Sequence, residues 1–110
     1  MPHAELKYSN DLTFDAKAAL LGIERVIQDH DAGSGECKGR AYPARDFHHT
    51  HCLLEVSMLT KSHRTPAFTQ TLLADLKAEL QRHLNVQCFV SLGIKYSDEN
   101  YITTEHVPFV

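Results

Sequence analysis

The sequence predicts a single α+β domain in which two β-α-β units form a four-stranded mixed sheet with two helices on one face. Three observations carry this prediction: four segments in which apolar and polar residues alternate, two helical patterns between them, and a length of 110 residues, which suits one domain. The order strand–helix–strand occurs twice, and each unit is long enough for a right-handed crossover between parallel strands. We expect one domain over residues 1–110, with halves at about 2–46 and 51–97 and a tail over 98–110.

The first half begins with a strand. Residues 2–8 alternate between apolar and polar side chains, which is the period of a half-buried strand. Thr13 is predicted to cap the following helix, with Asp15 in the first turn, where the helix dipole favours an anion. The apolar stripe of this helix repeats at steps of three and four residues, at Ala16, Leu20, Ile23, Ile27 and His30. A second strand is expected over 37–44, and Pro43 indicates an edge position or a bulge.

The second half follows a polar loop over 46–51. The third strand has one apolar face, made of Cys52, Leu54, Val56 and Met58. Thr65 and Pro66 are typical of a helix N-cap followed by proline at the first helical position, and Asn85 is predicted to end this helix. Its expected stripe is Leu73, Leu76, Leu80 and Leu84. The fourth strand places Cys88, Val90, Leu92, Ile94 and Tyr96 on one face.

The sheet face away from the helices predicts self-association. Apolar residues on that face, Leu53, Leu59 and Phe89 among them, would stay uncovered in a monomer. The tail adds four large apolar residues, at Tyr101, Ile102, Val107 and Phe109. We therefore expect a homotrimer whose site lies between subunits, because a domain of this size has little internal depth.

Composition limits the class of partner and the cellular compartment. The net charge is −3, which argues against a nucleic-acid partner, since such proteins carry a basic face. The three cysteines are odd in number and widely spaced, so neither a disulfide framework nor a structural zinc site is expected. The first residues lack the apolar core of a signal peptide, and no apolar run is long enough to span a membrane. The expected location is the cytoplasm, without a membrane partner.

Pro2 is the residue whose position suggests chemistry. A structural interpretation exists, because proline often opens a strand. However, removal of Met1 would leave a secondary amine at the N-terminus, and free α-amino groups titrate at about 7.7–8.0. Burial and nearby cations would lower that pKa further. Such a group can take a proton from carbon and return it elsewhere, as proton-transfer isomerisation requires.

Several segments resemble one family in order along the chain. Pro2-His3, followed by a strand, is similar to the start of the 5-carboxymethyl-2-hydroxymuconate isomerases, members of the tautomerase superfamily that includes macrophage migration inhibitory factor. The resemblance continues at residues 38–42, Lys-Gly-Arg-Ala-Tyr, where the family tends to have Arg-Ser-Arg-Ala-Tyr. It extends through 55–59 and 61–64 and reaches 100–107 with altered spacing, so it covers nearly the whole chain.

The resemblance implies a role for each of four residues. Pro2 matches the catalytic base, and Arg40 and Arg64 match arginines that bind substrate carboxylates, which suits a planar guanidinium. Lys38 stands where the family usually has arginine. The positive charge is therefore kept, but the two parallel N–H donors of a guanidinium group are lost. The implied reaction is a cofactor-independent keto–enol tautomerisation of a small unsaturated carboxylate, such as 5-carboxymethyl-2-hydroxymuconate. The departure at Lys38, and a loop over 46–51 shorter than the family's, leave the substrate open.

Two other functions remain open at the sequence level. A non-catalytic trimeric binding protein on the same scaffold is favoured if Met1 persists, because Pro2 would then lack a basic nitrogen. A metal-binding protein is suggested by His48, His49 and His51, since neutral imidazole is a common ligand. No metal is predicted, because Asp46 is the one carboxylate close to these histidines in the sequence.

Overall fold

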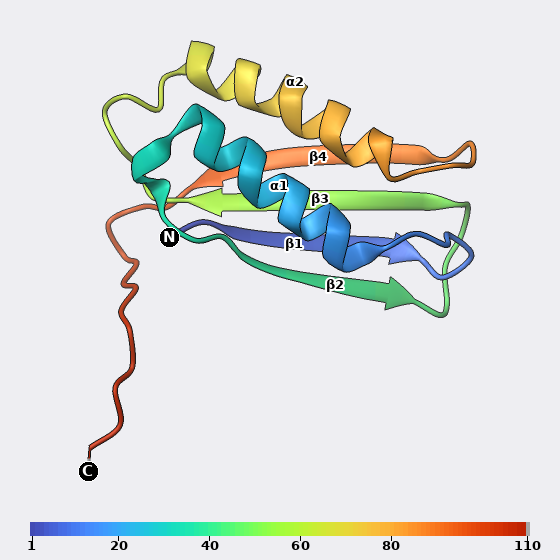
Figure 1. The fold of residues 1–110 in the computed structure, drawn as a ribbon, viewed down its shortest axis with the longest axis horizontal. Coiled ribbons are helices and arrows are strands. Elements are labelled where there is room, and N and C mark those ends of the chain that lie inside the picture. The colour runs from blue at the N-terminus through green and yellow to red at the C-terminus, as the bar shows by residue number, and fades with distance from the viewer. Residues whose placement is uncertain (110) are drawn as a thin grey trace.

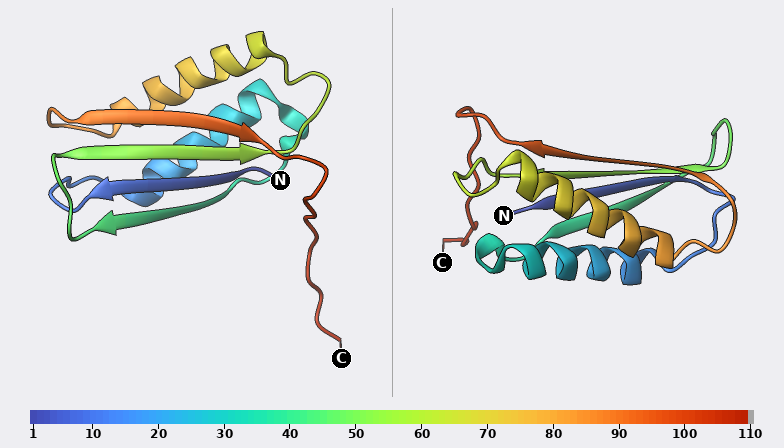
Figure 2. Two further views of the ribbon diagram at one scale, coloured as in Figure 1. Left: turned by 180° about the vertical axis from the view of Figure 1, so that it is seen from behind. Right: turned by 90° about the horizontal axis from the view of Figure 1, so that it is seen from above.

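The computed structural model describes residues 1–109 and consists of one four-stranded sheet with both helices on the same face (Figures 1 and 2). This confirms the predicted α+β class. The elements in order are β1 (His3–Ser9), α1 (Ala16–His30), the short 3-10 turn η1 (Ala32–Ser34), β2 (Lys38–Ala44), β3 (His51–Met58), α2 (Pro66–Arg82) and β4 (Phe89–Tyr96).

The strand order in the sheet is β2-β1-β3-β4. Strand β1 pairs with β2 in parallel, β3 pairs with β4 in parallel, and the central pair β1–β3 is antiparallel. Each half is therefore a parallel pair joined by its own helix, and an approximate twofold axis passes between the two central strands. Strand β2 lies at an edge, which explains how it accommodates Pro43 without losing a central ladder bond.

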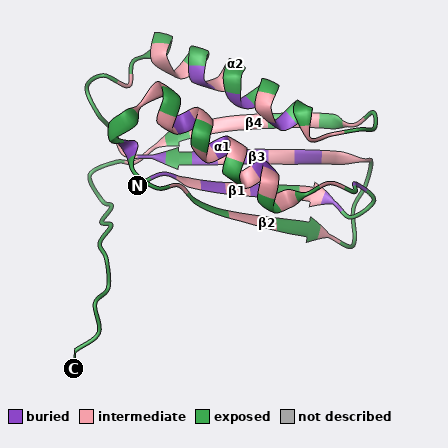
Figure 3. Cartoon of the chain, in the orientation of Figure 1, coloured by how far each residue is buried: buried purple, intermediate pink, exposed green. Residues whose placement is uncertain are grey.

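The core lies between the helices and the sheet, where the buried positions gather in Figure 3. Its main members are Ala4, Leu6, Ala19, Ile23, Ile27, Leu54, Val56, Leu72, Leu76 and Leu80, each at most 1% exposed. Burying one such leucine contributes about 1.5–3 kcal/mol. The predicted stripe of the second helix was wrong at one position, because Leu72 is buried and Leu73 is only half-buried.

The helix ends depart from prediction at three points. Asp15 caps α1, since its Oδ1 accepts a hydrogen bond from the Ala18 N–H at 3.0 Å. The predicted cap at Thr13 was therefore wrong, and Asp15 lies outside the first turn. Thr65 caps α2 as predicted, because its Oγ1 accepts from the Phe68 N–H. Helix α2 ends at Arg82, with His83 as its C-cap, before the predicted stop.

The open face of the sheet carries both polar and apolar side chains. Strand β1 presents His3, Glu5 and Lys7 on that side, because Ala4 and Leu6 are buried under the helices. Phe89, at 74% exposure, and Tyr42, the register partner of Lys7, at 43%, are exposed large apolar side chains on this face. The described part of the tail, residues 98–109, has no helix or strand and runs away from the sheet (Figure 1).

Candidate functional site

Four side chains, one from each strand, form a row across the open face of the sheet. The row lies at the end of the sheet where β1 and β2 begin and β3 and β4 finish. The register pairs His3 with Lys38 of β2 and with Ser57 of β3, and it pairs Ser57 with Lys95 of β4. Paired residues of neighbouring strands point to the same side of a sheet. We call Lys38, His3, Ser57 and Lys95 the cationic row.

Gly39 shows which side of β2 faces the helices and therefore on which side Lys38 and Arg40 lie. A Cβ at that position would lie 3.0 Å from Leu20 Cδ2, so the strand passes close to α1 and a side chain there would require Leu20 to shift. Gly39 thus faces the helix, and the residues on either side of it, Lys38 and Arg40, face the open side. Arg40 sits in the next row, opposite Glu5.

Pro2 immediately precedes the cationic row and is held to β2. Its carbonyl oxygen accepts a hydrogen bond from the Lys38 N–H at 2.9 Å. The Pro2 side chain is fully buried, whereas Met1 is 38% exposed. With Met1 attached, the Pro2 nitrogen belongs to a tertiary amide and has no basic lone pair.

Arg40 and His3 are in direct contact beside Pro2. Arg40 Nη1 lies 3.2 Å from His3 Nδ1, and Nη2 lies 3.5 Å from Glu5 Oε1. Because arginine can only donate, His3 Nδ1 accepts and carries no proton. Burial lowers the pKa of His3, and so do the charges of Arg40 and the terminal ammonium. His3 is therefore neutral at pH 7, and the Arg40 side chain, 42% exposed, keeps donors toward solvent.

Lys38 forms an ion pair with the neighbouring carboxylate of Glu36. Its Nζ lies 2.7 Å from Glu36 Oε2, and this hydrogen bond raises the pKa of Lys38 and lowers the pKa of Glu36. Both side chains are substantially exposed, at 44% and 76%. Solvent screens an exposed pair of this kind, so it contributes little to stability and an incoming carboxylate can compete with Glu36 for the ammonium group.

Arg64 occupies a different environment, which we call the buried corner: Arg64, Asp31, His63 and the Leu59 carbonyl. The Arg64 Nη2 and Nε atoms lie 2.8 and 3.0 Å from Asp31 Oδ2, and Nη1 donates to the Leu59 oxygen. The side chains of Arg64 and Asp31 are only 5% and 9% exposed. Burial raises the pKa of Asp31, but the hydrogen bonds from His63 and Arg64 outweigh it and hold this pKa below its ordinary value.

The structure therefore brings three of the four predicted site residues together. Pro2, Lys38 and Arg40 are adjacent, while Arg64 is engaged in the buried corner and is not part of the cationic row. For Arg64 to bind substrate, as predicted, it would have to release Asp31. Sequence reasoning missed Ser57 and Lys95, whose place beside His3 depends on strand register.

Cys37 is the thiol nearest to this site. Its backbone N–H donates to Glu24 Oε2 at 2.8 Å. Burial, and then the charge of Glu24, raise the pKa of its thiol to about 11. The thiol stays protonated at neutral pH and is therefore a weak nucleophile. All three cysteines are free.

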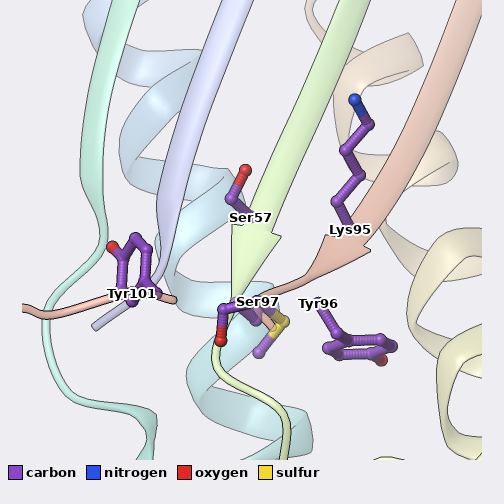
Figure 4. A pocket seen from close by; sticks show the side chains of 6 residues that line it. Ser57, Lys95, Tyr96, Ser97 and Tyr101 are labelled. Atoms are coloured by element: carbon purple, nitrogen blue, oxygen red, sulfur yellow. The ribbon is translucent and has the colours of Figure 1, made fainter. Parts of the chain in front are cut away.

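A small pocket adjoins the β3–β4 end of the cationic row (Figure 4). Its lining includes Ser57, Met58, Lys95, Tyr96 and Tyr101, and its volume is about 150 Å³. Sites for organic ligands commonly occupy about 300–1,000 Å³. This pocket on its own is therefore too small for a substrate of several carbons, although a second hollow of about 510 Å³, lined by Leu59, Lys61 and Tyr101 among others, lies next to it.

The histidine-rich loop lies at the other end of the sheet. His51 pairs with Phe89, at the end of β3 away from Ser57. The rings of His48 and His49 lie 4.1 Å apart, and His51 Nδ1 contacts the His49 carbonyl oxygen. Within residues 1–109, no group of three or more His, Cys, Asp or Glu side chains is arranged to hold a metal ion.

Comparison with solved structures identifies the fold. A 5-carboxymethyl-2-hydroxymuconate delta-isomerase matches with a TM-score of 0.75 at 17% identity, covering 96% of this chain and 89% of its own. A 5-carboxymethyl-2-hydroxymuconate isomerase from Deinococcus radiodurans R1 matches at 0.72 and 15% identity, with 96% and 90% covered. A macrophage migration inhibitory factor-like protein from Entamoeba histolytica matches at 0.70 and 13% identity, with 98% of each chain covered. The chain has the tautomerase fold.

The fold is recognised from tertiary structure and not from sequence. No protein-family model matches the chain, and no curated protein matches its sequence. The tautomerase fold thus rests on tertiary structure, at identities too low to transfer residue roles. Neither helix of residues 1–109 is long and apolar enough to cross a membrane.

Proposed function

We propose that this protein, once Met1 is removed, is a cofactor-independent tautomerase that moves a proton within a small unsaturated carboxylate. The observation that carries the proposal is the position of Pro2, which lies beside the cations Lys38 and Arg40 in a tautomerase fold. Trimming Met1 would convert the Pro2 nitrogen from an amide to a secondary amine. A substrate such as 5-carboxymethyl-2-hydroxymuconate fits this chemistry.

The proposed reaction uses the nitrogen as base and then as acid. The unprotonated amine of Pro2 takes a proton from the substrate, and the electron pair left behind spreads into a dienolate. The same nitrogen, now protonated, returns the proton to a different carbon of that system. Nearby cations keep the pKa of the amine low enough for the base form to be present near neutral pH.

Arg40 and Lys38 supply the electrostatic part of the mechanism. Both cations face the open side next to Pro2, and both have exposed donors. They would bind a substrate carboxylate and stabilise the negative charge that develops on the dienolate. Arg64 as a further carboxylate ligand stays a prediction, because its guanidinium is held by Asp31.

We also propose that the functional unit is a homotrimer in which a neighbouring subunit completes the site. The supporting observations are the small volume of the pocket beside Ser57, about 150 Å³, and the exposed tail, where Ile102 is 88% exposed and Phe109 fully so. Two structurally similar proteins are described as fused 4-OT symmetric trimers. Light scattering at micromolar concentration should give three times the subunit mass, and a monomer would contradict the proposal.

The deciding experiment compares two N-termini of the same protein. Isomerisation of 2-hydroxymuconate, followed by ultraviolet absorbance, should occur in protein shown by intact mass to lack Met1. Protein that retains Met1 should be inactive, because an amide nitrogen cannot accept the proton. In trimmed protein, Pro2→Ala should lower kcat by roughly 10²- to 10⁴-fold, the usual contribution of general acid–base catalysis.

A matched control separates chemistry from folding. Pro43→Ala makes the same substitution on β2, at the position that pairs with Tyr8 and away from the cationic row. This variant should keep full activity. Equal activity in trimmed and Met1-retaining protein would remove Pro2 from the mechanism.

A carboxylate-binding protein without catalytic activity is the second candidate. It is favoured by the buried state of Pro2 in the chain that carries Met1, because the cations could still bind an anion there. Inactive trimmed protein that still binds unsaturated carboxylates would support this alternative.

A further inference from the structure

The Arg40 side chain bends along β2 toward the end where Pro2 lies. Its register partner on β1 is Glu5, but its Nη1 atom lies 3.2 Å from Nδ1 of His3, which belongs to the next row toward Pro2. The same Nη1 also donates to the carbonyl oxygen of Lys38, the register partner of His3, at 3.4 Å. The guanidinium group therefore reaches from its own row into the cationic row.

Two side chains compete for this guanidinium group. Glu5 Oε1 lies 3.5 Å from Nη2 and would hold the group in the Arg40 row, one row further from Pro2. The ion pair with Glu5 is long and both side chains are more than a third exposed, so solvent screens it. The contact with His3 is shorter, and it is directional, because an imidazole nitrogen without a proton accepts along its lone pair.

The surroundings of His3 keep its Nδ1 free to accept. Burial lowers the pKa of His3, and the charge of Arg40 lowers it further. The charged groups that act on the ring are Arg40, the terminal ammonium, Glu5 and Lys38. On the other side, the β3 partner of His3 is the uncharged Ser57, and Glu55 lies one row away, opposite Glu5. At pH 7 the ring therefore accepts through Nδ1 and carries its one proton on Nε2.

We propose that His3 is a positioning residue that draws the Arg40 guanidinium group toward Pro2, where this cation binds the carboxylate of the substrate. The inference rests on the proposed function, in which Arg40 and Lys38 bind that carboxylate. His3 acts through Arg40 and does not itself touch the substrate. Without His3, the guanidinium group would move back toward Glu5 and neutralise a carboxylate of the protein instead of one of the ligand.

Two substitutions at the same position separate positioning from other effects. His3→Leu removes the acceptor, whereas His3→Asn keeps an acceptor oxygen close to the place of Nδ1. Binding of sorbate, a monocarboxylate, to Met1-trimmed protein is measured by calorimetry at neutral pH. His3→Leu should weaken binding roughly three- to tenfold, the usual effect of losing one hydrogen bond, and His3→Asn should restore most of it.

A double-mutant cycle tests whether His3 acts through Arg40. In an Arg40→Met background, His3→Leu should cause no further loss of sorbate binding, because the group that His3 positions is gone. His48→Leu is the matched control, since it removes an exposed histidine from the loop before β3, at the other end of the sheet, and it should not weaken binding. Thermal unfolding shows whether each variant is folded. If His3→Leu does not fold, His3→Gln, which moves the acceptor further from the backbone, takes its place.

A titration of the His3 ring by NMR tests the contact without any ligand. The hydrogen bond from Arg40 and its charge favour the neutral ring, so the pKa of His3 should rise toward its ordinary value in trimmed Arg40→Met protein. Burial is the larger cause of the lowered pKa and stays in this variant, so the rise should be partial. An unchanged pKa would contradict the inference.

The possible outcomes separate this inference from the proposed function. A raised pKa of His3 in Arg40→Met, together with rescue by His3→Asn, supports the positioning role even if the trimmed protein isomerises no enol acid. Equal binding in His3→Leu and wild type, equal losses in His3→Leu and His3→Asn, a further loss in the Arg40→Met background, or no sorbate binding by wild type at millimolar concentration would each overturn it. Isomerase activity that depends on removal of Met1 would leave the proposed function standing in each of those cases.

Discussion

Two arginines with the same sequence-based prediction occupy opposite kinds of environment. The Arg40 side chain is 42% exposed, and its nearest carboxylate oxygen is 3.5 Å away. The Arg64 side chain is 5% exposed and donates to Asp31 at 2.8 and 3.0 Å. Burial and the quality of the partner, rather than residue type, decide whether a guanidinium is available to a ligand. Arg40 is available, and Arg64 fastens the end of α1 to the loop that precedes α2.

The largest stability effect should come from the buried corner. Arg64→Met leaves the buried Asp31 carboxylate with only the half-exposed His63 ring as a partner, so the free energy of unfolding should fall by up to about 3–5 kcal/mol. Urea unfolding measures this, and Arg82→Met is the control, since the Arg82 side chain is 70% exposed and its pair with Glu79 contributes little. If Arg64→Met folds as stably as wild type but loses activity, Arg64 is a substrate ligand and the contrast with Arg40 fails.

Replacing Arg40 should lower activity and leave stability nearly unchanged, the reverse of the result expected for Arg64, and the change in free energy should be smaller. Arg40→Met removes a charge-assisted contact to substrate, which is worth about 1.5–3 kcal/mol, so kcat/KM should fall by roughly 10- to 100-fold. The free energy of unfolding should change by less than about 1 kcal/mol, because its ion pair is long and exposed. Arg45→Met is the matched control, since Arg45 is 88% exposed in a loop. Equal loss of activity in both variants would mean a nonspecific charge effect.

The buried corner should also make the free energy of unfolding depend on pH in the acid range, with a smaller effect than the two substitutions above. The pKa of Asp31 is lower in the folded chain than its ordinary value, so its stabilising contribution is complete at neutral pH. That contribution is lost as the pH falls from the ordinary range of an aspartate, about 4, through the lowered value. Urea unfolding from pH 6 down to pH 3 should therefore show a steeper loss of stability in wild type than in Asp31→Asn. Parallel curves would contradict this assignment.

Local patterns in the sequence were enough to predict the fold. The alternation of Cys52, Leu54, Val56 and Met58 predicted the buried face of β3, and all four side chains are at most 3% exposed. Pro43 predicted either an edge position or a bulge for β2, and β2 is an edge strand. The errors arose where two nearby residues fit the same sequence pattern equally well. Leu72 and Leu73 fit one helical stripe with different phases, and both Thr13 and Asp15 can cap a helix.

The candidate site was predicted only in part, because its remaining members are set by contacts between distant segments. Ser57 and Lys95 join His3 through the registers of β1–β3 and β3–β4, which no local pattern specifies. Arg64 was assigned to substrate by resemblance to the family, and nothing in the sequence indicated that Asp31, 33 positions earlier, would be its partner. A polar residue predicted for a site can be checked only after its possible partners elsewhere in the chain are placed.

The two edges of the sheet differ in how readily they could recruit another strand. Strand β2 carries Pro43, which removes a backbone donor, whereas β4 contains no proline and begins with the exposed Phe89. An uncovered, regular edge is a template for pairing with another chain. A solitary subunit would therefore aggregate first through β4. In the proposed trimer the order of events after synthesis would matter, because folded subunits would have to cover that edge before they meet unfolded chains.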